Sequence, residues 1–370
     1  MFLSRRKKID IGIVIFELTD ACNQSCRFCY NHFKGVETKC EVEAPDFRQA
    51  RRTLKRLQRE ANIASISLSG GEPMLLPRIH DLILRARAGG SNVNLLTNGT
   101  LLREDDIDIL HDLGVGLVQI PILSHKAEVH DHITMVRGSW ERATASAQRI
   151  TKINPDWLTP VFILSRLNVA DIEPTLEMYA SMGIKRIMLN RFNIGGLGRR
   201  YADELTLSHE ELRKAFGRAN TKLGELGIRA HNGVCTPMCV LSPAEYPNIT
   251  FTHCTTDLRS RPLTVNYRGD VRFCNHSPRV MGNIHNEPLS KILERETLDG
   301  YYNNIPDRCS ACELWSRCRG GCRAASEQLY GTFDLADPVL DLQTDYEVGY
   351  ETLDNIYVST SRLLGFKLRA

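Results

Sequence analysis

Short apolar runs alternate with longer amphipathic segments along the first half of the chain. Six runs have the length of buried strands: Gly12–Leu18, Ile63–Leu68, Val93–Thr97, Val115–Ile120, Val161–Ser165 and Arg186–Arg191. Five segments between them carry apolar residues at three- and four-residue steps, as helices do: Asp46–Ala61, Pro77–Ala88, Arg103–Leu113, Ser139–Ile153 and Asp171–Met182. The alternation predicts an α/β fold in which crossover helices join parallel strands.

Six strand–helix units favour a partial (β/α)6 TIM-like barrel over a closed eightfold one, and chemistry in such barrels lies on the loops after the strands. The glycine-rich stretch Asn193–Gly198 then predicts a flexible exit from the sixth strand, with a phosphate-cradling loop as the alternative. We expect the barrel over residues 1–200, a helical bridge over 201–234, a loop-rich, cysteine-rich extension over 235–340 and a C-terminal helix over 341–370.

Composition narrows the class of protein. The 370 residues are 42% apolar and 25% charged, which is ordinary for a soluble globular protein. A net charge of +3 is too small to indicate nucleic acid or an anionic membrane surface as a partner. The apolar stretch Ile11–Phe16 is too short for a signal peptide or a membrane span. Twelve cysteines gathered in motifs, without an export signal, indicate metal ligands in a reducing cytoplasm.

Three cysteines just after the first predicted strand are the strongest chemical signal. Cys22, Cys26 and Cys29 are spaced C-x3-C-x2-C. Three thiolates on one loop can hold three irons of a four-iron cube and leave the fourth iron open to a small ligand, whereas electron-transfer cubes use four cysteines. A zinc knuckle or unrelated free thiols are the alternatives.

A second motif follows the second predicted strand, where Gly70 and Gly71 precede Glu72 and Pro73. Adjacent glycines let the backbone approach a ligand closely, and a carboxylate can accept hydrogen bonds from an ammonium group. A plain tight turn would use the same glycines. Together with the cysteine triplet and its neighbouring Phe28, this motif resembles the radical S-adenosylmethionine (SAM) superfamily.

The resemblance implies roles for further residues. The Gly70–Pro73 motif would bind the methionyl amino group of SAM, and Thr97 and Asn98 would lie near the ligand. Arg137 matches a basic position that can pair with the SAM carboxylate, and Asn168 matches a ribose contact. Many relatives have polar residues at two positions where this sequence has Pro121 and Leu123. His130 and His132 are predicted as solvated loop histidines.

The C-terminal cysteines form the second strong signal. Cys309, Cys312, Cys318 and Cys322 are spaced C-x2-C-x5-C-x3-C, and Cys254 precedes a G-x4-C unit that ends at Cys274. This pattern resembles the SPASM domain, an extension of enzymes that mature peptides, quinone cofactors and sulfatases and that commonly holds two auxiliary four-iron clusters. The resemblance implies two ligand sets: Cys254, Cys274 and Cys322, and Cys309, Cys312 and Cys318. Zinc sites are the alternative.

Each ligand set is one thiolate short, because Leu340 stands where the family has a seventh cysteine and the extra cysteine often found after the first is absent between Cys254 and Cys274. Cys235 and Cys239 can supply missing ligands, Asp337 or Asp341 can replace the lost cysteine through oxygen, or an iron stays open. One or two auxiliary clusters are therefore expected. Cys40 fits no pattern and is predicted to be a plain thiol.

The resemblance implies reductive cleavage of SAM to methionine and a 5'-deoxyadenosyl radical, which takes a hydrogen atom from the substrate. The similarity to maturases of the pyrroloquinoline quinone and mycofactocin pathways favours oxidation or cross-linking of a ribosomally made peptide. A flavodoxin- or ferredoxin-type protein would supply the electron. Because the first strand starts near residue 12, a separate peptide-recognition protein would be needed.

Two alternatives remain at the level of sequence. One is radical modification of a small molecule such as a sugar, a tetrapyrrole or an amino-acid derivative. The other is a non-catalytic metal-binding protein. No residue is singled out as a catalytic acid or base.

Overall fold

The computed structural model describes residues 8–34, 44–254, 261–294 and 304–341. Its central part is the predicted partial barrel, in which neighbouring strands run parallel and are joined in sequence order. The barrel strands are β1 (Ile9–Glu17), β2 (Ala61–Ser69), β3 (Asn92–Leu96), β4 (Leu117–Pro121), β5 (Leu158–Leu164) and β6 (Arg186–Arg191). The predicted α/β fold is confirmed.

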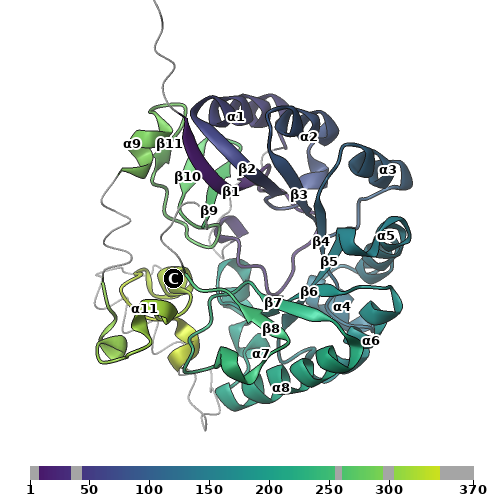
Figure 1. Cartoon of the computed structure of the whole chain (residues 1–370), viewed down its shortest axis with the longest axis vertical. Helices are drawn as coiled ribbons and strands as arrows, with labels where there is room; N and C mark the ends of the chain where they lie inside the picture. The colour runs from purple at the N-terminus through teal and green to yellow at the C-terminus, as the bar shows by residue number, and fades with distance from the viewer. Residues whose placement is uncertain (1–7, 35–43, 255–260, 295–303, 342–370) are drawn as a thin grey trace, which may run out of the picture.

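Helices cover the outer face of this curved sheet (Figure 1). They are α1 (Phe47–Glu60), α2 (Ile79–Ala88), α3 (Glu104–Asp112), α4 (Ala127–Thr134), α5 (Ser139–Ile153), α6 (Ile172–Ser181), α7 (Ala202–Leu205) and α8 (His209–Leu226). Local sequence sets several of their ends. The Asp46 carboxylate accepts hydrogen bonds from the first backbone amides of α1, and Ser208 and Glu211 form a capping box that starts α8. Gly227, with a φ of 64°, ends α8.

The sheet continues beyond the six barrel strands on both sides. In the described residues it has eleven strands, in the order β11-β10-β9-β1-β2-β3-β4-β5-β6-β7-β8. The added strands are β7 (Arg229–Asn232), β8 (Ile249–Phe251), β9 (Pro262–Asn266), β10 (Asp270–Arg272) and β11 (Gly282–Asn283). Strand β7 lies within the stretch expected to be a helical bridge, and β9 of the cysteine-rich extension pairs in parallel with β1. The sheet therefore crosses the boundaries that we expected at residues 200 and 234.

The rest of the extension has short helices and loops, as its composition predicts. Its helices are α9 (Leu289–Leu293), α11 (Trp315–Cys318) and α12 (Arg323–Tyr330). The helix expected over 341–370 and the thiol of Cys40 lie outside the described residues, apart from Asp341. Within the described residues, no helix is both long enough and apolar enough to span a bilayer.

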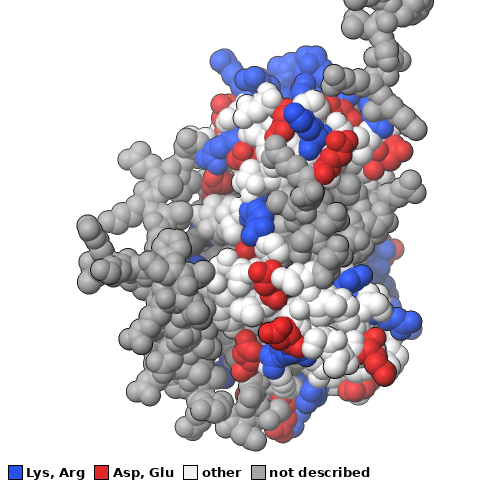
Figure 2. All heavy atoms as spheres, turned by 90° about the vertical axis from the view of Figure 1, so that its left-hand side faces the viewer, with Lys and Arg blue, Asp and Glu red and all other residues white. Residues whose placement is uncertain are grey.

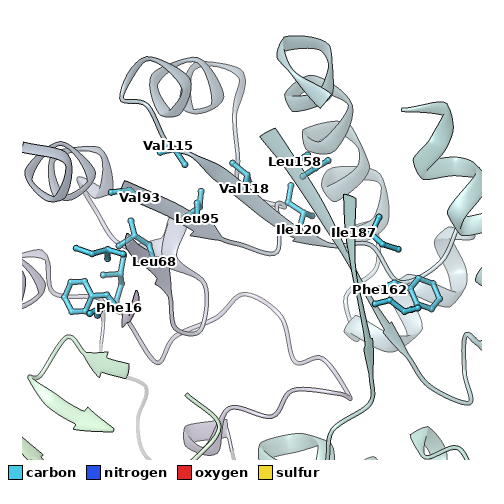
Figure 3. Close-up of a cluster of buried hydrophobic side chains, with 14 of the residues drawn as sticks. Phe16, Leu68, Val93, Leu95, Val115, Val118, Ile120, Leu158, Phe162 and Ile187 are labelled. Carbon is cyan, nitrogen blue, oxygen red and sulfur yellow. The ribbon is translucent and has the colours of Figure 1, made fainter. Parts of the chain in front are cut away.

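The hydrophobic core lies between the sheet and its helices, and Figure 3 shows part of it. Val118 and Ile120 of β4 pack there with Leu95 of β3 and Phe162 of β5, and all four are at most 1% exposed. Burying a side chain of this size contributes about 1.5–3 kcal/mol. On the face shown in Figure 2, acidic and basic side chains of the described residues are mixed, in keeping with the small net charge.

Candidate active site and auxiliary cluster sites

The cysteine triplet lies on the loop after β1, at the carboxyl ends of the barrel strands. The Cys29 amide donates to the carbonyl oxygen of Cys26 (3.0 Å), and the Gln24 amide donates to Cys22 Sγ (3.4 Å). Burial raises the pKa of the Cys26 thiol, and the neighbouring thiols of Cys29 and Cys22 raise it further. Thiols that converge and repel one another in this way suit a metal cluster, whose positive charge stabilises all of their thiolates.

Gly70 and Gly71 pack against this loop. The Gly71 amide donates to the carbonyl oxygen of Thr19 (2.7 Å) and the Glu72 amide to that of Ala21 (2.8 Å). A Cβ atom on Gly71 would lie 2.0 Å from the Ala21 oxygen, and one on Gly70 2.5 Å from the Thr19 oxygen. Because Gly70 and Gly71 have no side chains, their backbone lies directly against the backbone of the cysteine loop. This contact holds the loop beside the end of β2.

Glu72 is fully buried between the loops that follow β2 and β3. Its carboxylate accepts hydrogen bonds from the Thr97 hydroxyl (2.6 Å), the Asn98 amide (2.7 Å) and the Met74 amide (2.9 Å). Burial raises the pKa of Glu72, and no cation among the described residues opposes that effect. A carboxylate offers about four acceptor positions, and three of them are used within the protein.

Asn98 connects this carboxylate to the cysteine loop. Its side-chain amide donates to Asn23 Oδ1 (2.7 Å) and lies 4.0 Å from Cys22 Sγ, while its own oxygen accepts from Thr100. Pro73, the last residue of the glycine motif, is buried at the start of a 3-10 helix, Pro73–Leu75. The structure thus brings Glu72, Thr97 and Asn98 together beside the triplet.

Arg137 and Asn168 are placed differently. Arg137 lies exposed in the turn before α5. The Asn168 side chain is fully buried, and its amide nitrogen donates to the carbonyl oxygens of Leu123 and Ile163 (2.9 Å each). Its oxygen accepts from the amide (2.8 Å) and hydroxyl of Ser165. All hydrogen-bonding positions of this amide are used inside the protein.

The prediction of a solvated His130 is wrong. His130 lies on helix α4 and is 1% exposed. Its Nδ1 accepts a hydrogen bond from the Leu123 amide (3.1 Å), and burial lowers the pKa of the ring to about 4. The apolar Leu123, which departs from the family pattern, is buried beside it. His132 is exposed, although it lies on the same helix rather than on a loop.

The cysteines of the extension fall into two groups. In the first, the Cys235 thiol hydrogen bonds to Cys254, and the charges of Cys254, Cys322 and Cys274 all raise the pKa of Cys235. Asn193 donates to Cys322 Sγ (3.3 Å). Burial and the Asp337 charge raise the pKa of Cys322 to about 12. These thiols converge from four separate parts of the chain.

The second group is closer to the surface. Burial raises the pKa of Cys239, and the neighbouring thiols of Cys318 and Cys312 raise it further. The same two thiols and Cys239 act on Cys309. No group of three or more His, Cys, Asp or Glu side chains in the described ranges is arranged around a single metal ion.

Several residues that join the triplet to the extension carry no recognisable signal in the sequence. Tyr30, next to Cys29, packs against His276 with the two rings tilted and 4.7 Å between their centroids, and its hydroxyl accepts from Asn275 (2.6 Å). Gln328 of α12 donates to the Tyr30 carbonyl oxygen (3.0 Å) and accepts from the Gly196 amide (2.7 Å). Their residue types are ordinary, so only the fold reveals their role.

Gly196 corrects the expectation of a flexible exit after β6. Its φ is 47°, and a Cβ atom there would lie 2.4 Å from the Asn31 carbonyl oxygen and 2.7 Å from that of Cys29. The Gly198 amide also donates to the Cys29 carbonyl oxygen (3.0 Å). The glycine-rich stretch forms a 3-10 helix, Gly196–Tyr201, that packs on the backbone of the cysteine loop.

Comparison with known proteins agrees with this arrangement. Residues 16–179 match the model of the radical SAM superfamily, and residues 254–319 match that of SPASM, an iron–sulfur cluster-binding domain. The chain therefore carries a radical SAM domain followed by a SPASM domain and is an enzyme of the radical SAM class. These domains imply four-iron clusters and SAM as cofactors. The cysteine triplet and the two cysteine groups of the extension have the ligand type that such clusters need.

Two relatives are similar over most of their length. The PqqA peptide cyclase of Gluconobacter oxydans (strain 621H) is 23% identical over 350 residues, which is 92% of this chain and 94% of the relative. The Fe-coproporphyrin III synthase of Methanosarcina barkeri (strain Fusaro / DSM 804) is 26% identical over 368 residues, 91% of this chain and 89% of the relative.

Solved structures share the fold. Streptococcus suis SuiB bound to S-adenosylmethionine superposes with a TM-score of 0.68 at 15% identity, over 90% of this chain and 77% of SuiB. Native anSMEcpe with bound AdoMet and Cp18Cys peptide gives 0.66 at 16% identity, over 96% and 98%. The fold of this chain is thus shared with these proteins.

Proposed function

We propose that this enzyme is a peptide maturase that uses SAM to oxidise or cross-link a ribosomally made peptide. The observation that carries the proposal is the similarity to PqqA peptide cyclases over about nine-tenths of the chain, with both domains included. When bound, the SAM cluster and SAM supply a radical that removes hydrogen from an unactivated C–H bond.

The residues of this chain would bind and orient SAM. Cys22, Cys26 and Cys29 would hold the cluster, and Glu72 would use its remaining acceptor position for the ligand ammonium group. Arg137 is the candidate partner of the ligand carboxylate, and its exposure leaves the guanidinium free to turn toward it. The proposed role of Asn168 is indirect, because its amide holds the loop after β4.

The remaining partners also belong to the proposal. A flavodoxin- or ferredoxin-type protein would donate the electron, and a separate recognition protein would present the peptide. We propose a cytoplasmic location, where such donors are found and thiols stay reduced.

The test uses the anaerobically reconstituted protein with SAM, a strong reductant and a candidate precursor peptide. We expect 5'-deoxyadenosine and methionine to form, and the peptide mass to fall by that of two hydrogen atoms. Protein that contains four-iron clusters and binds SAM but forms no 5'-deoxyadenosine would contradict the radical chemistry. Deoxyadenosine without a change in any peptide would contradict the choice of substrate.

A tetrapyrrole substrate is the second candidate, because a relative named Fe-coproporphyrin III synthase is as similar as the peptide cyclases. The same assay with an iron porphyrin in place of the peptide separates the two. Under the peptide proposal, we expect the porphyrin mass and absorbance to stay unchanged.

A further inference from the structure

We propose that Cys235 and Cys239 each complete one auxiliary four-iron cluster. The two resulting ligand sets are Cys235, Cys254, Cys274 and Cys322, and Cys239, Cys309, Cys312 and Cys318. A closed cube takes four thiolates, and in this chain the missing thiolate of each set comes from the loop after β7. The proposal goes beyond the proposed function, since it holds whichever substrate the enzyme modifies.

Backbone contacts tie Cys235 to the first set. Its carbonyl oxygen accepts from Arg191 Nη2 (3.3 Å), and the same guanidinium is ion-paired with Asp337. Asp337 Oδ2 in turn accepts from the Cys322 amide (2.8 Å). The side chain of Cys235 hydrogen bonds to Cys254. Cys235 therefore contacts Cys254 and is linked to Cys322 through Arg191 and Asp337.

A turn directs Cys239 to the second set. The Pro237 carbonyl oxygen accepts from the amides of Val240 and Leu241, which places Cys239 within a turn. The Met238 amide then donates to Cys318 Sγ (3.4 Å), so residue 239 is adjacent to that thiol. Arg213 of α8 holds the turn by donating to the Cys239 carbonyl oxygen (3.0 Å).

A close fit positions this turn against the cysteine motif of the extension. A Cβ atom on Gly321 would lie 2.6 Å from the ring of Pro237. Gly321 has a φ of 80° and is followed directly by Cys322. The segment from Cys235 to Cys239 therefore passes between the two groups of thiols and contacts both.

The carboxylates that could replace a cysteine already have polar partners within the protein. Both oxygens of Asp337 are occupied, by Arg191 and the Cys322 amide on one side and by the Val339 amide (2.9 Å) on the other. Asp341 accepts from Arg308 (2.6 Å) and from the Tyr330 hydroxyl (2.8 Å). Moving Asp337 away from its partners would leave buried polar groups unsatisfied.

The test begins with Cys235→Ser and Cys239→Ser, which keep the side-chain volume. The anaerobically purified wild type should hold about twelve irons per chain in three cubes. Each variant should either lose about four irons or keep a cube that now has a replaceable iron. A cube of the second kind loses that iron on mild oxidation, and the resulting three-iron cluster gives a characteristic electron paramagnetic resonance (EPR) signal.

The double variant should show both losses, and SAM binding should persist, which demonstrates that the barrel is folded. Cys40→Ala is the matched control, with unchanged iron and EPR spectra expected. Wild-type iron content and spectra in either single variant would overturn the assignment. A double variant that loses no more iron than one of the single variants would also overturn the assignment.

A rescue experiment separates the two sets. The Arg308–Asp341 ion pair joins the neighbours of Cys309 and Leu340, so Leu340→Cys would introduce a thiol near the second set. Leu340→Cys should restore iron and spectra to Cys239→Ser and leave Cys235→Ser defective. Restoration of Cys235→Ser instead would overturn the partition, and it can be observed as a gain even if single variants lose stability.

Discussion

The cysteine loop after β1 and the cysteine-rich extension bring their thiols together in opposite ways. The loop brings its three thiols from eight consecutive residues, and neither its own sequence nor the elements packed on it supply a fourth among the described residues. The extension brings eight thiols from stretches scattered between Cys235 and Cys322. An incomplete ligand set leaves an iron for SAM, whereas a complete set protects a cluster from ligands. Thiolate count thus separates the reactive region from the auxiliary one.

The largest effect should come from the loop. Changing Cys22, Cys26 and Cys29 together to Ala should abolish formation of 5'-deoxyadenosine, because these three thiols are the proposed ligands of the cluster that SAM would bind. Product analysis after reduction checks this. Iron in the extension should persist, so a variant that loses all of its iron would show that the two regions do not load independently.

A buried ion pair joins the two regions and should affect stability strongly. Arg272 of β10 pairs with Glu17 of β1, and both are at most 3% exposed. Burial raises the pKa of Glu17, while the Arg272 charge opposes the rise. Arg272→Met leaves the carboxylate buried without its partner and should lower the unfolding free energy by about 3–5 kcal/mol.

Denaturant unfolding measures this loss. The double variant Arg272→Met, Glu17→Gln should recover part of it, because no unpaired charge then remains. If Arg272→Met lowered stability by less than about 1 kcal/mol, the value of an exposed pair, the two regions would not depend on this contact.

A substitution of Glu72 tests whether the region around the cysteine loop binds SAM. Glu72→Ala removes a charge-assisted hydrogen bond to the ligand worth about 1.5–3 kcal/mol. SAM affinity should fall by roughly ten- to a hundredfold, with the iron content unchanged. Equilibrium binding measures the affinity, and Glu72→Gln separates charge from shape. Equal affinity in the wild type and in Glu72→Ala would remove the carboxylate from the ligand site.

A separate effect concerns pH. His130 has a folded pKa of about 4 against a usual value of 6.5. Above pH 6.5 the ring is neutral in both states, so it adds no pH dependence. As pH falls from 6.5 toward 4, the unfolded chain binds a proton that the folded protein does not, and stability falls by about 1.4 kcal/mol per pH unit.

His130→Gln keeps an acceptor for the Leu123 amide but does not titrate. Its unfolding free energy should therefore depend less steeply on pH over this window, as urea titrations at several pH values would show. Parallel profiles for the wild type and the variant would mean that the folded ring is protonated normally.

Features that depend on residues close together in the sequence could be predicted. Strand β6 and helix α5 have the predicted bounds, because hydrophobic periodicity is a local signal. The triplet and the Gly70–Glu72 motif are local too, and the structure brings them together. Helix α4 was missed, because its single buried histidine and short length resemble a polar loop.

Contacts between distant residues were not predictable. Nothing in the local pattern of Pro262–Asn266 indicates that it pairs with β1, and an amide such as that of Gln328 carries no signal of the loop it holds. The partition of Cys235 and Cys239 depends on a turn and on Arg191, which are visible only in three dimensions.

The pairing of β1 with β9 also has a consequence for synthesis of the chain. Glu17 is aligned with Asn266, about 250 residues later. At about 5–20 residues per second, the ribosome needs roughly 12–50 s to reach the partner strand. During that time one edge of β1 has exposed backbone groups that can pair with other chains. A nascent chain stalled before β9 would therefore have a nearly finished barrel and an open, aggregation-prone edge beside its cysteine loop.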